Sequence, residues 1–319
     1  MGTAMQWSAR HPFVITALKT AAAALLLAGV FLYVDVSALI RSLRSADPVW
    51  IAAGALLLLP NLLIQFLRWR FLLRTVRVHA SNSSVFASLA AGFTAGFFTP
   101  AQLGEIGGRL YSLDPSQRAS VLTMAALDKV YIMGMTVSLG LAATAVYIPL
   151  YLPALWNTGL TVLSFAASAA MAIVLLFPAL AKNLLLRLPA RVRMHRWFAP
   201  ARIFEADFKT QSAFLLSGQT FVLFAVIIAQ YHCFVNAFTP ANASASMLCV
   251  PIVLFVKSVL LPISIADLGV RESASVFFYM RTGVPATAAL NASLCIFAVN
   301  IVVPALLGIA MFMKPQSRT

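Results

Sequence analysis

The sequence predicts an all-α polytopic membrane protein, and three observations lead to this fold class. Hydrophobic residues make up 61% of the 319-residue chain and charged residues only 10%, and the mean hydropathy is +0.90. Soluble domains carry about 25% charged residues, so a soluble protein is excluded. Several apolar stretches reach the roughly 20 residues that a helix needs to cross a bilayer. Two further apolar stretches are interrupted near their middles by Pro and Gly.

Six uninterrupted apolar stretches predict about six membrane-spanning helices. They run from Pro12 to Val34, Val49 to Leu67, Ala119 to Ile148, Gly159 to Leu180, Ser212 to Phe238 and Ala286 to Met313. The first stretch is longer than the roughly 7–15 apolar residues of a signal-peptide core, so we expect an uncleaved span.

The two interrupted stretches, Val85 to Tyr111 and Ser244 to Met280, predict re-entrant hairpins that enter and leave on the same side of the membrane. Pro breaks a helix by removing a backbone donor, and Gly permits close backbone approach. The breaking residues are Pro100, Gly104, Pro262 and Gly269. Spans and hairpins together predict one membrane domain over residues 1–319, with inverted repeats at roughly 1–150 and 155–319. If the hairpins are full spans instead, the chain crosses eight times.

The distribution of positive charge predicts the orientation. The net charge of +14 lies mainly in short hydrophilic stretches, above all the basic linker 182–211. This pattern favours anionic lipid headgroups as partners and argues against nucleic acid. In the six-span topology, only Arg41, Arg44, Arg271 and Arg281 face the side opposite the termini. We therefore predict a multi-pass protein with both termini in the cytoplasm, and the Ala- and Arg-rich composition indicates a bacterial inner membrane.

Charged residues within the apolar stretches define the candidate substrate site. A charge at the bilayer centre costs at least about 2.5–3.5 kcal/mol, so these groups must face one another or a wet cavity. They are Glu105, Arg109, Asp128, Lys129, Lys257, Asp267, Arg271 and Glu272. Paired broken helices mark transporter substrate sites, so the pattern indicates a carrier of a polar substrate. The alternative is that these charges only fix the hairpins through salt bridges.

Spacing and position predict how the polar side chains are used. Asp267 and Arg271 are four residues apart and pair if the segment is helical, which leaves Glu272 to Lys257 or Lys129. The arginines Arg68, Arg70 and Arg74 are expected to extend from the end of their span to lipid headgroups. The remaining polar residues are expected to form hydrogen bonds between helices: Asn61, Gln65, Gln219, Gln230, His232, Asn291 and Asn300.

Three segments together resemble a known family. They are Asn61-Leu-Leu-Ile-Gln-Phe-Leu-Arg-Trp-Arg70 with Arg74, Thr99-Pro-Ala-Gln-Leu-Gly-Glu105 with Arg109, and Leu261-Pro262 followed by Leu268-Gly-Val-Arg-Glu272. This set is similar to the flippase-like membrane domain of lysylphosphatidylglycerol synthases, and the resemblance covers nearly the whole chain. It implies the translocating half of such a synthase without the soluble aminoacyl-transferase half.

The chain departs from the family pattern at two places. Ala266-Asp267 stands where the family tends to have Gly-Gly, which adds a carboxylate beside Leu268. Asp128-Lys129 stands where the family often has Glu-Arg. The charge signs are kept, but Lys lacks the planar fork with which Arg grips phosphate at two points.

The predicted function is that of a lipid translocase. The resemblance implies movement between leaflets of an anionic or zwitterionic phospholipid, an aminoacyl-phospholipid, or a polyprenyl- or hopanoid-type lipid. In this interpretation Arg109, Lys129, Lys257 and Arg271 hold a lipid phosphate, while Glu105 and Glu272 bind a cationic headgroup or a coupling proton.

Enzyme motifs are absent from the sequence. It contains no Gly-rich phosphate loop, nucleophile elbow or His/Cys cluster, so we predict no catalytic residue, metal or cofactor. Two alternatives stay open, a membrane transferase acting on a lipid-linked substrate and a non-transporting partner of lipid- or glycan-biosynthesis enzymes. The sequence also leaves open a homo-oligomer.

Overall fold

The computed structural model describes residues 44–99, 102–187, 208–260 and 269–312, and all regular secondary structure in them is helical. Five helical segments are long and apolar enough to cross a membrane. They are Pro48–Thr75, Pro115–Tyr151, Thr158–Leu176, Thr210–Asn236 and Ala286–Met311. These match five of the six predicted spans and confirm the all-α polytopic class. The remaining one, Pro12 to Val34, lies outside the described residues.

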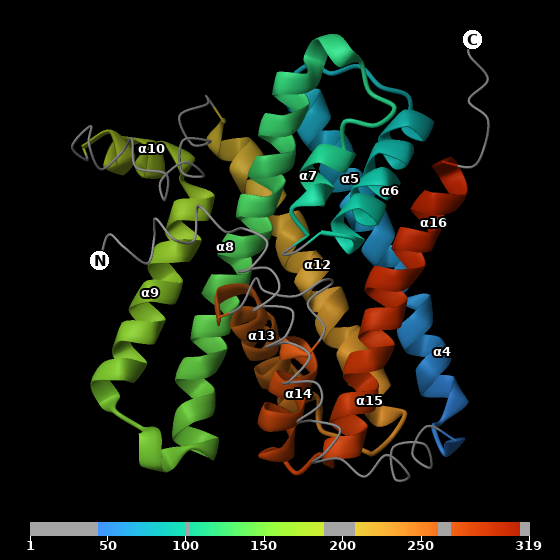
Figure 1. Ribbon diagram of the computed structural model, residues 1–319. Helices are drawn as coiled ribbons and strands as arrows, with labels where there is room; N and C mark the ends of the chain where they lie inside the picture. The colour runs from blue at the N-terminus through green and yellow to red at the C-terminus, as the bar shows by residue number, and fades with distance from the viewer. Residues whose placement is uncertain (1–43, 100–101, 188–207, 261–268, 313–319) are drawn as a thin grey trace, which may run out of the picture.

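The elements follow one another from α4 to α16 (Figure 1). Their order is α4 (Pro48–Leu56), α5 (Leu58–Thr75), α6 (Asn82–Phe97), α7 (Gly104–Gly108), η1 (Pro115–Gln117), α8 (Arg118–Tyr151), η2 (Pro153–Leu155), α9 (Thr158–Leu176), α10 (Pro178–Arg187), α12 (Thr210–Asn236), α13 (Ala243–Leu260), α14 (Val270–Met280), α15 (Ala286–Phe297), η5 (Ala298–Val302) and α16 (Val303–Phe312). The segment η5 is a single stretch of π-helix that joins α15 to α16.

Local sequence signals set where several helices begin. Asp47 Oδ1 accepts from the Val49 N–H at 2.8 Å and Pro48 follows it, so α4 has both a side-chain cap and a residue suited to the first turn. The Asn157 side chain likewise caps α9, by accepting from the backbone N–H groups of Gly159 and Leu160. Before α8, the Ser116 backbone N–H donates to Asp114, and this hydrogen bond lowers the pKa of the exposed Asp114 carboxyl.

The first interrupted stretch forms a hairpin of α6 and α7. Both helices lie in the upper half of the bundle in Figure 1, and the chain leaves at the end where it entered. A Cβ at Gly108 would lie 2.6 Å from the Ala91 carbonyl oxygen, and one at Gly104 would overlap that of Ala95. Only glycine permits this approach of the two backbones. Pro100 lies outside the described residues.

The second interrupted stretch places α13 and α14 against each other in the lower half of the bundle (Figure 1). Gly269 precedes α14 with φ +93°, a conformation that favours glycine. Residues 261–268, and with them Pro262 and Asp267, lie outside the described residues. The two hairpins therefore occupy opposite halves of the bundle, with the described ends of their breaks directed toward its middle.

Each hairpin packs against the long helix that follows the other hairpin. Helix α6 lies against α16, and α13 lies against α8. A glycine makes each contact close, because a Cβ at Gly308 would overlap the Ala90 carbonyl oxygen and one at Gly140 would overlap the Phe255 side chain. Helices α5 and α12 also pack on each other. The helices up to α8 and those from α9 onward therefore interlock.

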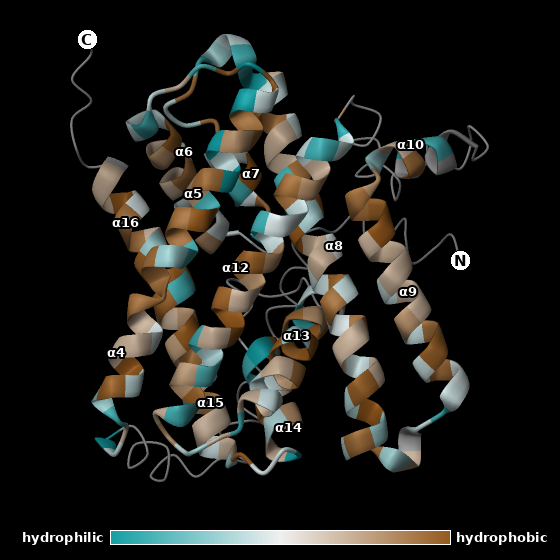
Figure 2. Ribbon diagram, turned by 180° about the vertical axis from the view of Figure 1, so that it is seen from behind, coloured by the Kyte–Doolittle hydropathy of each residue, from teal (hydrophilic) through white to brown (hydrophobic). Residues whose placement is uncertain are grey.

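The outer surface of the bundle is apolar. Figure 2 shows mainly hydrophobic residues along the outer helix α9, and hydrophilic ones both at the ends of the bundle and in its middle. Leu160, Val162 and Leu163 on α9 are each more than half exposed, which in a membrane protein means contact with lipid. Of the basic linker 182–211, the structure describes the part in α10, which lies across one end of the bundle (Figure 1), and residues 208–211.

Candidate functional site

Five charged side chains form one continuous network that joins the first hairpin to α5 and α8. Asp128 on α8 bridges two arginines, with Oδ1 2.6 Å from Arg68 Nη2 and Oδ2 2.8 Å from Arg109 Nη1. Arg109 Nη2 lies 2.6 Å from Glu105 Oε1, and Lys129 Nζ lies 2.7 Å from Glu105 Oε2. Cations and carboxylates thus alternate along a chain that joins α5, α7 and α8. We call these five residues the charge network.

The charge network contains three cations and two carboxylates, and its members differ in exposure. The Arg68, Arg109, Asp128 and Glu105 side chains are at most 10% exposed, whereas that of Lys129 is 29% exposed. Buried charges are tolerated when each is paired and hydrogen-bonded. Lys129 is therefore the member that a ligand can reach most readily.

Two neutral residues hold Arg109 in place. Its guanidinium carbon lies 4.6 Å from the centre of the Trp69 ring, a cation–π contact. Trp69 Nε1 donates to Ser88 Oγ at 3.1 Å, and Ser88 Oγ donates in turn to the Arg109 carbonyl oxygen. We did not predict these roles from the sequence, although Trp69 lies within the Arg68-Trp69-Arg70 segment that carries the resemblance.

The structure corrects the expectation for Arg68. We expected it to reach lipid headgroups with Arg70 and Arg74, but Arg68 is 1% exposed and pairs with Asp128. The physical reason is that Asp128, deep in an apolar helix, requires a cation close by. Arg70 is partly buried and Arg74 is exposed.

The second hairpin has a smaller charged group formed by Arg271 and Glu272. Arg271 Nε donates to Glu272 Oε1 at 3.0 Å, and Nη2 of the same guanidinium contacts that oxygen as well. The Gly269 N–H donates to Glu272 Oε2 at 2.8 Å, and Ser293 Oγ donates to Oε1 at 3.3 Å. Glu272 is fully buried. Its carboxylate therefore caps the start of α14 as well as neutralising an arginine.

Our predicted partners for Glu272 were wrong. Lys129 pairs with Glu105, and the ion pair of Glu272 is with its neighbour Arg271. Neighbouring residues on a helix do not usually face each other, but at the first turn the long Arg271 side chain folds back to the capping carboxylate. Pairing of Asp267 with Arg271 stays a prediction.

A cavity of about 190 Å³ lies between the two hairpins. Its charged lining comes from both, with Glu105 from α7, Lys257 from α13 and Arg271 from α14, and Lys129 on α8 completes it. Glu272 is not among the lining residues. Among the described residues, the charged lining thus has one carboxylate and three cations, a surplus of positive charge that suits an anionic group. We call it the central cavity.

A comparison with models of known protein families identifies the family of this chain. The model of the lysylphosphatidylglycerol synthase TM region matches residues 15–308. The chain belongs to this family. No curated protein and no solved structure gave a significant match. The match includes both hairpins, every member of the charge network and the second charged group, so all the predicted site residues lie within the lysylphosphatidylglycerol synthase TM region.

Uncharged amide side chains beside the central cavity connect α5, α12 and η5. Gln230 on α12 donates to Asn300 on η5 at 3.1 Å and accepts from Asn300 at 2.8 Å and from Asn61 on α5 at 3.3 Å. Gln65 donates to Asn61 at 2.6 Å. These contacts confirm the predicted hydrogen bonds between helices for Asn61, Gln230 and Asn300. The Asn291 amide, in contrast, has no hydrogen-bond partner among the described residues.

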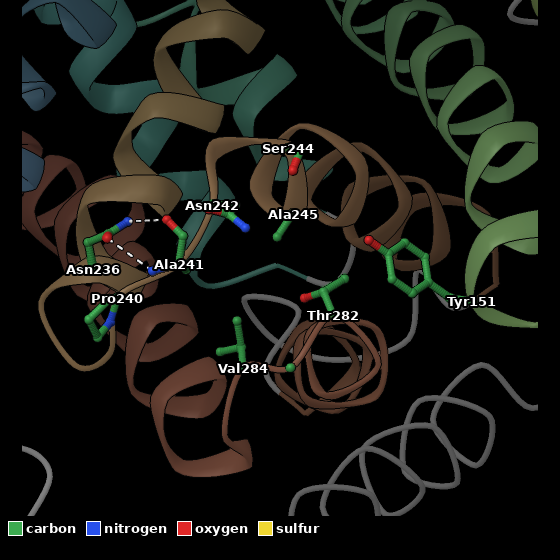
Figure 3. A pocket seen from close by; sticks show the side chains of 10 residues that line it. Tyr151, Asn236, Pro240, Ala241, Asn242, Ser244, Ala245, Thr282 and Val284 are labelled. Atoms are coloured by element: carbon green, nitrogen blue, oxygen red, sulfur yellow. Dashed lines mark hydrogen bonds between the residues drawn. The ribbon is translucent and has the colours of Figure 1, made fainter.

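A second pocket, of about 260 Å³, lies where α8 and α12 end and α13 begins, and Figure 3 shows the side chains that line it. Its lining includes the uncharged polar side chains of Tyr151, Asn242, Ser244 and Thr282 and has no charged residue. Asn236 shapes one wall by exchanging hydrogen bonds with the Ala241 backbone. Among the described residues, no group of three or more His, Cys, Asp or Glu side chains could hold a metal ion.

Proposed function

We propose that this protein moves a phospholipid with an anionic or zwitterionic headgroup, including an aminoacyl-phospholipid, between the leaflets of a membrane. The observation that carries the proposal is the central cavity, where side chains of both hairpins and of α8 meet and where the described charged lining has three cations and one carboxylate. The headgroup would cross through this cavity while the acyl chains stay in the bilayer. Membership of a lipid-related membrane family supports the same function.

The mixed charge of the lining supports a headgroup that carries both signs. Lys129, Lys257 and Arg271 match a phosphate, and Glu105 matches an ammonium group such as that of an aminoacyl ester. A charged headgroup crossing hydrocarbon alone faces a cost of many kcal/mol, which paired charges in a polar cavity would lower.

A bound headgroup could replace the ion pair between Lys129 and Glu105 with its own contacts to these two side chains. Both side chains line the cavity, and their Nζ to Oε2 distance is 2.7 Å. A phosphate entering the cavity would compete with Glu105 for Lys129, while the Arg109 contact keeps the Glu105 carboxylate compensated. Opening this pair would therefore not leave an isolated buried charge.

The reciprocal packing of the hairpins supports two inverted repeats that rock against each other. Helix α6 packs on α16 and α13 packs on α8, and exchanging the two halves turns one contact into the other. Such rocking would open the central cavity to each leaflet in turn.

We further propose a bacterial inner-membrane location with α10 and both termini on the cytoplasmic side. Helix α5 ends and α8 begins at the α10 end of the bundle (Figure 1), and Arg74, Arg77 and Arg118 are exposed there. A surplus of basic residues marks the cytoplasmic side.

A reconstituted lipid-flipping assay tests the proposal. Liposomes with the wild-type protein and a fluorescent phosphatidylglycerol are treated with a membrane-impermeant quencher, and the slow loss of inner-leaflet signal gives the flipping rate. We expect Lys129→Gln to slow flipping roughly tenfold, because it removes the most exposed cation of the charge network, about 1.4 kcal/mol of headgroup contact. Arg118→Gln removes the same charge from an exposed position outside the cavity and should match the wild type. Equal rates in all three proteins, or no rate above empty liposomes, contradict the proposal.

A further inference from the structure

A third pocket, of about 360 Å³, lies where α5 ends and α6 begins. Its basic lining residues are Arg70, Arg74 and His79, and Ser81 adds a hydroxyl. We call it the basic pocket. It shares no lining residue with the central cavity. Helix α5 ends and α6 begins at the end of the bundle that carries α10 (Figure 1).

The guanidinium groups of the two arginines in the basic pocket are not engaged by any residue that the structure describes. Neither the Arg70 nor the Arg74 guanidinium forms a hydrogen bond or ion pair with any described residue, in contrast to the guanidinium groups of Arg68 and Arg109 in the charge network. No carboxylate lines the pocket. Two guanidinium groups whose donors are unused, at one concave site, form a typical binding arrangement for a phosphate, which they can grip through paired hydrogen bonds.

The rest of the lining suits an amphiphilic ligand. Leu73, Val78 and Val85 form apolar walls, and each is at most 4% exposed. Ser81 caps α6, whose backbone dipole places partial positive charge at the same pocket. The volume lies within the range of small-molecule sites. An inorganic phosphate would use the arginines and leave the apolar walls unused, whereas a glycerophospholipid would use both.

We propose that the basic pocket binds the phosphate of an anionic phospholipid at the membrane surface, separately from the central cavity. Helix geometry supports the separation, because Arg68 and Arg70 are two residues apart and so lie on nearly opposite faces of α5. Arg68 faces the charge network, and Arg70 lines the pocket. The site goes beyond the proposed flipping function and does not depend on it.

The test is a native mass spectrometry titration of detergent-solubilised protein with dioctanoyl-phosphatidylglycerol, which resolves each successively bound lipid. The background variant Lys129→Gln/Lys257→Gln removes two cations of the central cavity. In this background, adding Arg70→Gln/Arg74→Gln should weaken the tightest lipid-binding step roughly 10- to 30-fold, because two basic contacts to an anionic headgroup are lost. The matched control Arg77→Gln/Arg118→Gln removes two exposed positive charges from the same end, outside the lining, and should change the affinity less than twofold.

Three results distinguish the interpretations. Loss of affinity only with Arg70→Gln/Arg74→Gln supports the site, and failure of inorganic phosphate to displace the lipid identifies the lipid headgroup as its ligand. Displacement by millimolar inorganic phosphate supports the same phosphate site with a soluble ion as ligand. Equal affinities for the two double variants overturn the proposal, provided that their thermal unfolding matches that of the background. Because the readout is binding, a failed flipping assay does not affect this result.

Discussion

Asp128→Asn is the sharpest test of the charge network. Asp128 is 3% exposed and bridges Arg68 and Arg109 at 2.6 and 2.8 Å. The substitution keeps the shape of the side chain and removes its charge. The network then contains three cations and one carboxylate, and the two buried arginines face each other without the anion between them.

The expected destabilisation is about 3–5 kcal/mol, the cost of removing one partner from a buried ion pair. At about 1.4 kcal/mol per tenfold change, the folding equilibrium constant falls by more than 100-fold. Arg68→Gln in the same chain should recover part of this loss, because it removes one of the two uncompensated cations. The double variant is therefore expected to be less destabilised than the sum of the two single variants.

Unfolding in mixed detergent and sodium dodecyl sulfate micelles, followed by tryptophan fluorescence, measures these differences. Asp47→Asn is the matched control, because Asp47 is a carboxylate at the exposed start of α4 and Asn is an equally good helix cap. We expect the control to lie within about 0.5 kcal/mol of the wild type. If Asp128→Asn lies within 1 kcal/mol of Asp47→Asn, or if the double variant is additive, the buried network does not act as described.

Two further substitutions test the packing and the second hairpin. Gly308→Ala should lower the unfolding free energy by about 1–3 kcal/mol, because the added Cβ overlaps the Ala90 carbonyl oxygen. Gly218→Ala is the control in the same unfolding assay. Its added Cβ meets nothing within 4 Å, so it should be neutral or stabilising. Glu272→Gln should lower the unfolding free energy by about 2–3 kcal/mol, because it weakens charge-assisted hydrogen bonds from Gly269 and Arg271. An unchanged thermal unfolding midpoint would show that this carboxylate does not anchor α14.

Much of the fold follows from the sequence because bilayer thickness fixes the length of an apolar helix. The five spans in the described residues were predictable for this reason. The hairpin of α6 and α7 was also predictable, because about 15 apolar residues before Pro100 are too few to cross with ease. An unpaired charge in the bilayer centre is costly, so Glu105 and Arg109 could likewise be predicted to pair with other charged side chains.

The charge partners themselves were less predictable, because hydropathy does not reveal how a helix is rotated about its axis. Arg68 and Arg70 differ by about 200° around α5, so the two could not both face lipid headgroups. A buried carboxylate such as Asp128 on a neighbouring span could have identified Arg68 as the inward-facing residue. The pairing of Arg271 with Glu272 depends on capping at Gly269, where the backbone conformation has a positive φ that spacing alone does not show.

The location of the ion pairs bears directly on the proposed rocking motion. Every ion pair between two described side chains joins residues of the same half, with the charge network in residues 44–151 and the Arg271–Glu272 pair in the other half. Between the described residues, the hydrogen bonds that cross from one half to the other are neutral, such as Asn61 to Gln230 and Thr94 to the Ala305 carbonyl.

Neutral hydrogen bonds contribute about 0.5–1.5 kcal/mol each, whereas breaking a buried ion pair costs several times more. The proposed rocking of the halves would therefore exchange the weaker contacts and keep each set of buried charges paired. It also changes the distance between Lys129 in one half and Arg271 in the other, both of which line the central cavity. The same movement would thus open the cavity and release a phosphate held between these two cations.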